Sequence, residues 1–353
     1  MNAPARKATL ALAVATLAIL VGVAIHKTQS RLITYTRSGT GIMGTTWSIT
    51  AVAPVNNRAL ADRATQAALE ALGRVEAQMS CYLARSELSQ LNAAPAGQFV
   101  ALSASTVDVL GMSRDLTART DGAFDATCRP ILQLWRSAGR SGRVPDAEQI
   151  ARALDQSGWR HIELADDGAT KRIDAACMDL GGIAKGFGID QAVEAMIAAG
   201  CEAGIVDVGG DLRCFGTKPD GGKWVVAVQS PFAEDRTIAT LALEAGAVCT
   251  SGNYRRFSEI AGQRYSHIVN PRTGRPVDLA PSVTVVAPRA ACADAWATAL
   301  SVIGTEGLAL LAKQADTEAM LLVGGPQEFT HHASEGFAEF MLEGPDLKPN
   351  GKE

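Results

Sequence analysis

Short runs of β-forming residues, joined by turns that contain glycine, fill much of the second half of the chain. Examples are GIVDVGGDLRCFG at 204–216, KWVVAVQSP at 223–231 and SVTVVAP at 282–288. Strands joined by such short turns pair antiparallel, because a parallel connection needs a crossover of a dozen or more residues. Apolar segments with helical spacing interrupt them at 188–200 and 292–304. The pattern predicts an α+β fold with a largely antiparallel sheet and flanking helices.

The first half of the chain predicts fewer strands and longer helices. Residues 41–54 alternate enough to predict one strand, and 61–82 place apolar residues at helical spacing. A second helix is expected from 103 to a stop near Asp121 and Gly122. A composition of 47% hydrophobic and 20% charged residues excludes a disordered, collagen-like or multispan membrane protein.

The N-terminus carries a separate signal. Residues 8–25 contain no charge and follow Arg6 and Lys7, which is typical of a signal peptide or a single membrane anchor. We therefore assign residues 1–31 to export or anchoring and residues 32–353 to the folded body. A cleaved segment and a retained anchor remain open.

The charge of the folded body limits its partners. Residues 1–31 hold four basic residues and no acid, which leaves 29 basic and 37 acidic residues in 32–353. Nonspecific nucleic-acid binding depends on neutralising phosphates with Lys and Arg. The acidic body therefore predicts no nucleic-acid partner.

The seven cysteines are scattered and form no C-x-x-C pair. That spacing argues against a zinc site or a redox motif. Most of them lie in apolar stretches, which predicts buried structural thiols, and the odd number leaves at least one thiol unpaired.

The segment MDLGGIAKGFG at 178–188 is the first candidate for chemistry. A predicted strand ends in a Gly-Gly turn that opens directly into a helix. Backbone N–H groups at a helix start suit a phosphate, and Lys185 adds positive charge. The alternative is a tight turn that needs glycine only for its backbone angles.

Two further clusters contain metal-binding or acid–base residue types. Asp294 and Thr298 are four apart on a predicted helix and share a face, and such oxygen ligands suit Mg²⁺. The alternative is a helix cap and a surface threonine. His267 lies between two glycine-bearing turns, and it is either a site residue or a structural histidine.

Eight stretches in this order resemble the ApbE-type FAD:protein FMN transferase family. They span residues 43–304 and are MGTTW, MSCYLARSELSQLN, DGAFDATCRPILQLW, DLGGIAKGFGIDQ, VDVGGDL, TSGNYRRF, RYSHIVNPRTGRPV, and SVTVVAP followed by ADAWATALSVIG. The chain departs from the pattern at Cys81, where threonine is common, at Asn270, where aspartate is usual, and in having no N-terminal lipid-attachment cysteine. The departures leave Asp294 and Thr298 unaffected.

The resemblance implies a flavin transferase domain over residues 32–353. It implies FAD as substrate, Mg²⁺ as cofactor, and transfer of FMN to a threonine of an acceptor protein with release of AMP. By this resemblance His267 and Asp294 act in catalysis, and Gly182, Asp294 and Thr298 hold the metal. The residues expected to contact FAD are Met43, Tyr82, Ala123, Phe124, Asp125, Asp179, Lys185 and Ile268.

The resemblance also implies partners and a location. The acceptor would carry a D-x-x-[ST]-x-[AS]-T type motif and belong to a membrane electron-transfer complex. The enzyme would be bacterial, on the periplasmic side of the inner membrane, or soluble in the periplasm if the N-terminal segment is cleaved. Two other functions use the same site: a FAD pyrophosphatase that releases FMN and AMP, and a noncatalytic flavin-binding module.

Overall fold

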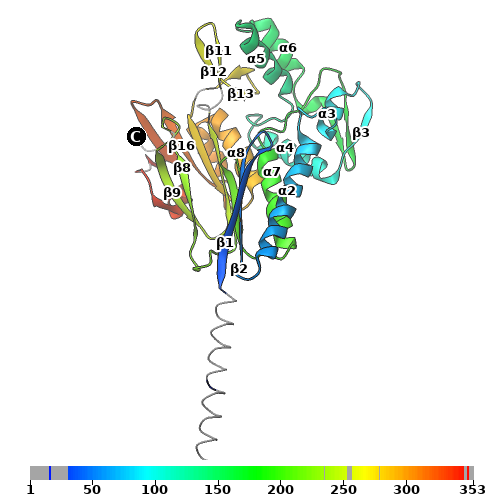
Figure 1. The fold of residues 1–353 in the computed structure, drawn as a ribbon. Coiled ribbons are helices and arrows are strands. Elements are labelled where there is room, and N and C mark those ends of the chain that lie inside the picture. Colours follow the sequence, from blue (N-terminus) through cyan, green and yellow to red (C-terminus); the bar gives the residue numbers. More distant parts are fainter. Residues whose placement is uncertain are drawn as a thin grey trace, which may run out of the picture.

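The computed structural model describes residues 31–233, 235–252, 257–277, 279–345 and 348–349, together with residue 16. A nine-stranded sheet runs through its centre (Figure 1). All neighbours in it pair antiparallel except β17 and β19, so the predicted α+β class with a largely antiparallel sheet is confirmed. Its strands, in spatial order, are β1 (Leu32–Ile42), β2 (Thr45–Pro54), β6 (Gly204–Val208), β7 (Asp211–Phe215), β10 (Gly246–Gly252), β15 (Ser282–Ala287), β16 (Glu318–Gly324), β17 (Phe329–Ala333) and β19 (Lys348–Pro349).

Both faces of the central sheet are covered. Helices α2 (Arg58–Met79), α7 (Ala184–Ala198) and α8 (Ala290–Ile303) pack on one face (Figure 1). A small sheet of β8 (Trp224–Gln229), β9 (Thr237–Leu243) and β18 (Met341–Glu343) packs on the other. The side chains of β15 alternate between the two layers, because Val285 joins the helix side and Val286 the sheet side. The short α9 (Leu308–Leu311) adds Leu308 to the helix side.

Helices α7 and α8 approach each other closely and cap each other. A Cβ at Gly186 would lie 2.1 Å from the carbonyl oxygen of Ala290, so only glycine fits there. The Asp190 carboxylate of α7 accepts hydrogen bonds from the first N–H groups of α8, at Ala290 and Ala291. In return the Asp294 carboxylate of α8 accepts the Gly186 N–H, in the first turn of α7. Two buried carboxylates thus stabilise two helix N-termini.

Two smaller units extend the body. One contains α3 (Glu87–Ala93), α4 (Ala104–Arg119) and a three-stranded sheet of β3 (Phe99–Ala101), β5 (Gly168–Lys171) and β4 (Ile162–Ala165). The other lies at the top of Figure 1 and has its own core, which includes Ile131, Trp135, Ile150 and Ile260. Its elements are α5 (Arg129–Ser141), α6 (Ala147–Asp155), β11 (Phe257–Ile260), β12 (Gln263–Ser266), β13 (Val269–Asn270) and β14 (Arg275–Pro276).

The structure corrects two expectations. The single strand expected at 41–54 is a hairpin of β1 and β2, and β1 begins at Leu32. The strand expected before the Gly-Gly turn is wrong, because residues 174–180 join no sheet. The side-chain amide of Asn92 takes the place of a neighbouring strand: it bonds both the N–H and the carbonyl of Met178. Sequence periodicity cannot distinguish such a pinned extended segment from a strand.

The predicted export or anchor segment, residues 1–31, lies outside the described residues apart from positions 16 and 31. Within the part of the chain that the structure describes, no helix has the length and apolar character needed to cross a membrane.

Candidate active site

A cavity of about 1330 Å³ lies between the central sheet, α7, α8 and the small unit that carries α5 and β12. The structure brings every predicted site residue to its wall, although they come from six separate stretches of sequence. They are Met43, Tyr82, Ala123, Phe124, Asp125, Asp179, Gly182, Lys185, His267, Ile268, Asp294 and Thr298.

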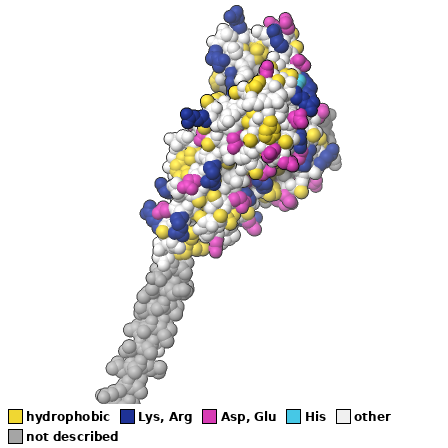
Figure 2. All heavy atoms as spheres, turned by 90° about the vertical axis from the view of Figure 1, so that its right-hand side faces the viewer, with side chains coloured by type: hydrophobic (Ala, Val, Ile, Leu, Met, Phe, Trp, Pro, Cys, Tyr) yellow, Lys and Arg dark blue, Asp and Glu magenta, His cyan; other side chains and the backbone are white. Residues whose placement is uncertain are grey.

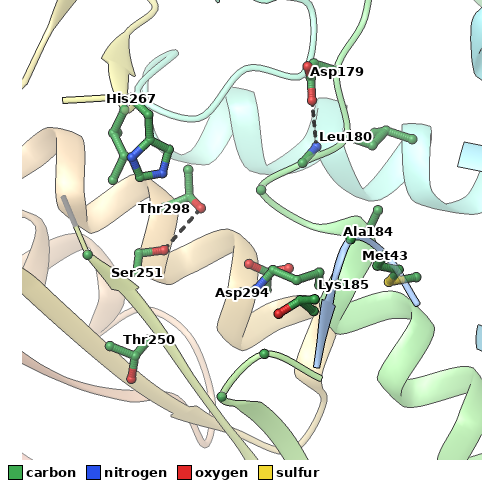
Figure 3. Close-up of a pocket in the computed structure, with 18 of the residues that line it drawn as sticks. Met43, Asp179, Leu180, Ala184, Lys185, Thr250, Ser251, His267, Asp294 and Thr298 are labelled. Atoms are coloured by element: carbon green, nitrogen blue, oxygen red, sulfur yellow. Dashed lines mark hydrogen bonds between the residues drawn. The ribbon is translucent and has the colours of Figure 1, made fainter. Parts of the chain in front are cut away.

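Asp294, Thr298 and Gly182 line the cavity where α8 approaches the Gly-Gly turn before α7, and Figure 3 shows Asp294 and Thr298 there. Asp294 is 4% exposed and lies inside α8, whose cap residue is Arg289, so the alternative that Asp294 is a simple N-cap is wrong. A Cβ at Gly182 would lie 3.0 Å from the Thr298 hydroxyl oxygen. Gly182 does not have a positive φ, so it is needed for space and not for its backbone angles.

This group offers only hard oxygen donors: a carboxylate, a hydroxyl and a backbone carbonyl. That donor chemistry fits Mg²⁺, which takes one or two carboxylates and completes its shell with phosphates and water. A side chain at position 182 would crowd Thr298 and Phe124, so glycine is the residue that lets this turn approach the Thr298 hydroxyl. Burial raises the pKa of the Asp294 carboxyl, while the Lys185 ammonium and the Gly186 N–H oppose the rise.

Lys185 provides positive charge beside this group, and its position is fixed. Its ammonium forms an ion pair with the buried carboxylate of Asp211 at the start of β7. The second Asp211 oxygen accepts the N–H of Thr250 on β10. Asp207, across the β6–β7 turn, also lines the cavity, and burial raises its pKa while the Gly210 N–H and Lys185 oppose the rise. A helix and two strands therefore hold one cation at the cavity wall.

A second charged cluster surrounds Asp179. Its carboxylate accepts from Arg129 at 3.0 Å and from the Cys81 thiol at 3.4 Å, and Arg136 lies 3.6 Å away. The Arg136 guanidinium also lies 5.5 Å from the ring centre of Tyr82, whose side chain is 74% exposed. Asp179 thus holds two arginines, and one of them, Arg136, lines the cavity and extends toward an exposed aromatic ring.

The remaining predicted contacts line the walls between these clusters. Asp125 accepts the N–H and the hydroxyl of Thr127, and burial raises its pKa against both hydrogen bonds. Met43 occupies the β1–β2 turn with a φ of 49°, and a Cβ on Gly188 of α7 would collide with its methyl group. That glycine lets the Met43 side chain reach the helix. Phe124 is buried beside Gly182.

His267 and Ile268 line the cavity from the unit that carries α5 and β12. They follow β12, and Figure 3 shows the His267 ring on the same side as Thr298 and Ser251. The Ser251 and Thr298 hydroxyls are 3.5 Å apart. Ile268 is fixed by its N–H, which donates to Ser266, and by its carbonyl, which accepts from Val277. An imidazole therefore faces the space above the oxygen-donor group.

Several site residues were not predicted from the sequence. They are Asp211, Ser251, Arg129 and Arg136. Three lie in stretches that the motifs already contained, VDVGGDL, TSGNYRRF and DGAFDATCRPILQLW, and Arg136 follows the last of these directly. A lysine placed near a phosphate site also signals a nearby acid, because a half-buried ammonium is rarely left unpaired.

Comparison with known proteins identifies the family of the chain. Residues 43–321 match the model of the ApbE family. A FAD:protein FMN transferase of Vibrio cholerae is 33% identical over 306 residues, which cover 85% of this chain and 90% of the relative. One from Klebsiella pneumoniae is 31% identical and covers 85% of this chain and 87% of its own length.

Solved structures show the same similarity. The flavin transferase ApbE from Vibrio cholerae has a TM-score of 0.75 at 30% identity and covers 88% of this chain and 99% of its own. The ApbE protein of Thermotoga maritima has a TM-score of 0.77 at 30% identity, with coverages of 88% and 100%.

Proposed function

The chain belongs to the ApbE family, and from this premise we propose that it is a FAD:protein FMN transferase whose active site is the cavity described above. One observation carries the proposal at the level of residues. Asp294, Thr298 and Gly182, from two separate elements, form a pure oxygen-donor group beside a fixed lysine and below a histidine.

Transfer breaks one bond of the FAD diphosphate and forms another. The hydroxyl oxygen of an acceptor threonine attacks the phosphorus on the FMN side, and the bond from that phosphorus to the oxygen of the AMP phosphate breaks. AMP leaves with the bonding electron pair. Charge builds on the non-bridging oxygens, so the enzyme must provide positioning and positive field more than a nucleophile of its own.

The residues of the site have separate roles in this reaction. Asp294, Thr298 and the Gly182 carbonyl would hold Mg²⁺, which when bound supplies a Lewis acid for the diphosphate oxygens. Lys185 adds a second cation whose place is set by Asp211. The first turn of α7 contributes less than an uncapped helix would, because its Gly186 N–H already donates to Asp294. The Lys185 ammonium is therefore the main positive group that the chain itself supplies beside the oxygen-donor group.

His267 is the base that we assign to the acceptor hydroxyl. It lies on the cavity wall opposite α7, where an incoming hydroxyl passes it before it reaches the diphosphate. A neutral imidazole near physiological pH accepts a proton without prior activation. Asp294 is the second candidate for this role.

The acceptor and the location extend the proposal. We propose an acceptor protein with a D-x-x-[ST]-x-[AS]-T type motif, in a membrane electron-transfer complex. Arg6 and Lys7, followed by the charge-free run at residues 8–25, support transport of the enzyme across the bacterial inner membrane. The segment is then either retained as an anchor or cleaved to leave a soluble periplasmic enzyme.

The test is covalent labelling. Purified protein with FAD, Mg²⁺ and a peptide that carries the acceptor motif should give a fluorescent peptide that survives denaturation, together with one AMP per label. Asp294→Ala should give no label. Release of FMN and AMP at a rate that the peptide does not alter would assign the site to a pyrophosphatase, and FAD that stays intact for hours with Mg²⁺ would assign it to a binding module.

A further inference from the structure

The unit above the cavity has a charge opposite to that of the rest of the body. We define the arginine lobe as residues 129–161 and 257–277, which hold nine arginines, no lysine and four acidic residues. Outside these two stretches, residues 32–353 hold 20 basic and 33 acidic residues. A net charge of +5 therefore lies on a small lobe, whereas the rest of residues 32–353 carries −13.

The lobe does not neutralise this charge internally. Arg152 and Arg160 pair with acids of the lobe itself, and Arg129 and Arg136 pair with Asp179. Four others are exposed and form no ion pair within the part of the chain that the structure describes: Arg140, Arg143, Arg264 and Arg275. Arg264 instead stacks 3.6 Å from the ring centre of Phe257, which is itself 46% exposed.

The lobe forms one wall of the cavity. Trp135, Arg136, Ser258, Tyr265 and His267 belong to the lobe and line the cavity. Arg140 lies one turn after Arg136 on the same face of α5, so the arginines continue from the cavity wall onto the outer surface. Figure 2 shows basic groups along the upper and left edges of this lobe. One unit of the fold thus carries both His267 at the cavity wall and the exposed arginines outside it.

We propose that the arginine lobe is the docking surface for the acceptor, and that it selects acceptor segments with acidic residues around the reacting hydroxyl. This inference rests on the proposed function and adds the chemistry of the partner. An acidic segment is attracted to the lobe and repelled by the rest of the surface, so the charge difference both steers the segment and orients it toward the cavity. Exposed Phe257 gives the same surface an apolar contact.

The position of the lobe favours a protein segment over a lipid surface. Strand β1 begins at Leu32 at the lower end of the molecule in Figure 1, and the lobe lies at the upper end. A chain that is tethered to a membrane through the residues before Leu32 therefore turns the lobe away from the tether. None of the four unpaired arginines lines the cavity, so their removal leaves the FAD contacts intact.

The experiment compares two peptides and three proteins. Both peptides carry the same acceptor motif, one flanked by glutamates and the other by lysines. The proteins are the full-length wild type, a lobe variant with Arg140, Arg143, Arg264 and Arg275 all changed to Gln, and a control variant with Arg37, Arg63, Arg74 and Arg114 changed to Gln. The control positions are also exposed, so both variants lose the same total charge.

We expect the wild type to have a KM for the glutamate peptide about tenfold below that for the lysine peptide at low salt, with the ratio shrinking as salt rises. The lobe variant should bring the ratio close to one with an unchanged Kd for FAD, and the control variant should keep the wild-type ratio. Equal KM values in the wild type, or a ratio that the lobe variant retains, would overturn the docking surface while labelling itself still supports the transferase.

Two further outcomes contradict the inference in different ways. If neither peptide is labelled by the wild type, the proposed function fails and the docking surface fails with it. If the wild type binds vesicles of anionic lipid, the lobe variant does not, and the peptide ratio is the same in both, then the lobe is a lipid-binding surface.

Discussion

The floor of the cavity and the arginine lobe above it are built in opposite ways. The floor lies between α7 and α8, where Asp190 and Asp294 each cap the other helix and Gly186 brings the backbones into contact. The lobe has a core of only seven buried apolar side chains, and two of its strands are two residues long. Reacting groups need fixed positions, whereas a surface that receives a partner does not.

The comparison also separates two uses of charge. At the floor, each charged side chain is buried or half-buried and has a named partner, as Lys185 has Asp211. On the lobe, four exposed arginines form no ion pair within the described residues. The first arrangement sets the field at one point, and the second acts over a distance and is screened by salt. Mutations at the floor should therefore change the rate of transfer, and mutations on the lobe should change the approach of the partner.

The largest effect is expected at Asp294. In Asp294→Asn the amide oxygen still accepts the Gly186 N–H, so the α7–α8 contact survives, but the formal charge that holds the cation is lost. We expect the rate of flavin labelling to fall by about a thousandfold or more, with the melting temperature within a few degrees of the wild type. Single-turnover labelling and calorimetry measure both quantities.

The matched control is Asp190→Asn, the other half of the reciprocal caps. Asp190 lies outside the cavity wall and pairs with Arg213. This variant should lower the melting temperature and retain labelling. If both variants lose stability equally and lose labelling equally, Asp294 is a structural residue only.

A smaller effect is expected from Gly182→Ala. The new methyl group would lie 3.0 Å from the Thr298 hydroxyl and 3.2 Å from the Phe124 ring, so the carbonyl at 182 and the hydroxyl must move apart. We expect a loss of about 10- to 100-fold in the affinity for Mg²⁺ measured by titration of labelling activity. Gly111→Ala in α4 is the control, because its Cβ would contact nothing within 4 Å. That control should raise stability slightly. Equal Mg²⁺ affinity in both variants would show that the space beside Thr298 is not used.

The sequence predicted most of the floor because its residues lie in compact motifs. The spacing of Asp294 and Thr298 places both on one face of a helix, and the structure keeps them there. Short glycine turns also predicted the antiparallel sheet, and the β6–β7 turn has positive φ at both Gly209 and Gly210. Such features depend on neighbours in sequence, and a pattern can report them.

The relations that the sequence did not predict join residues far apart in the chain. The side-chain amide of Asn92 forms the hydrogen bonds to Met178 that a neighbouring strand would form. Asp211 of β7 forms the ion pair that fixes Lys185 of α7. The lobe combines two stretches that are separated by about 100 residues, so its summed charge appears only after folding. Local periodicity contains no information on these pairings.

The independence of the lobe can be tested with two matched tryptophans. Trp135 of the lobe and Trp224 of the body are both buried, and each indole N–H donates to a glycine carbonyl at 2.8 Å. Trp135→Ala should cost the lobe about 3–5 kcal/mol. Amides of 129–155 and 257–277 should then exchange with deuterium about 100-fold faster or more, while those of β6 and β15 keep their protection. In Trp224→Ala the amides of β8 and β9 should exchange faster, while those of the lobe keep their protection. Faster exchange everywhere in both variants would mean that lobe and body unfold as one unit.

The smallest effect concerns Cys81, where floor and lobe meet. Burial and the neighbouring Asp179 charge raise the pKa of this thiol to about 11. At pH 8 only about one molecule in a thousand then carries the reactive thiolate, so alkylation by iodoacetamide should be slow and should rise about tenfold per pH unit until the pKa is reached. Asp179→Asn removes the negative charge and should speed alkylation at pH 8. Mass spectrometry of the Cys81 peptide follows the rate, and fast labelling of the wild type at pH 8 would show that Asp179 and burial do not control this thiol.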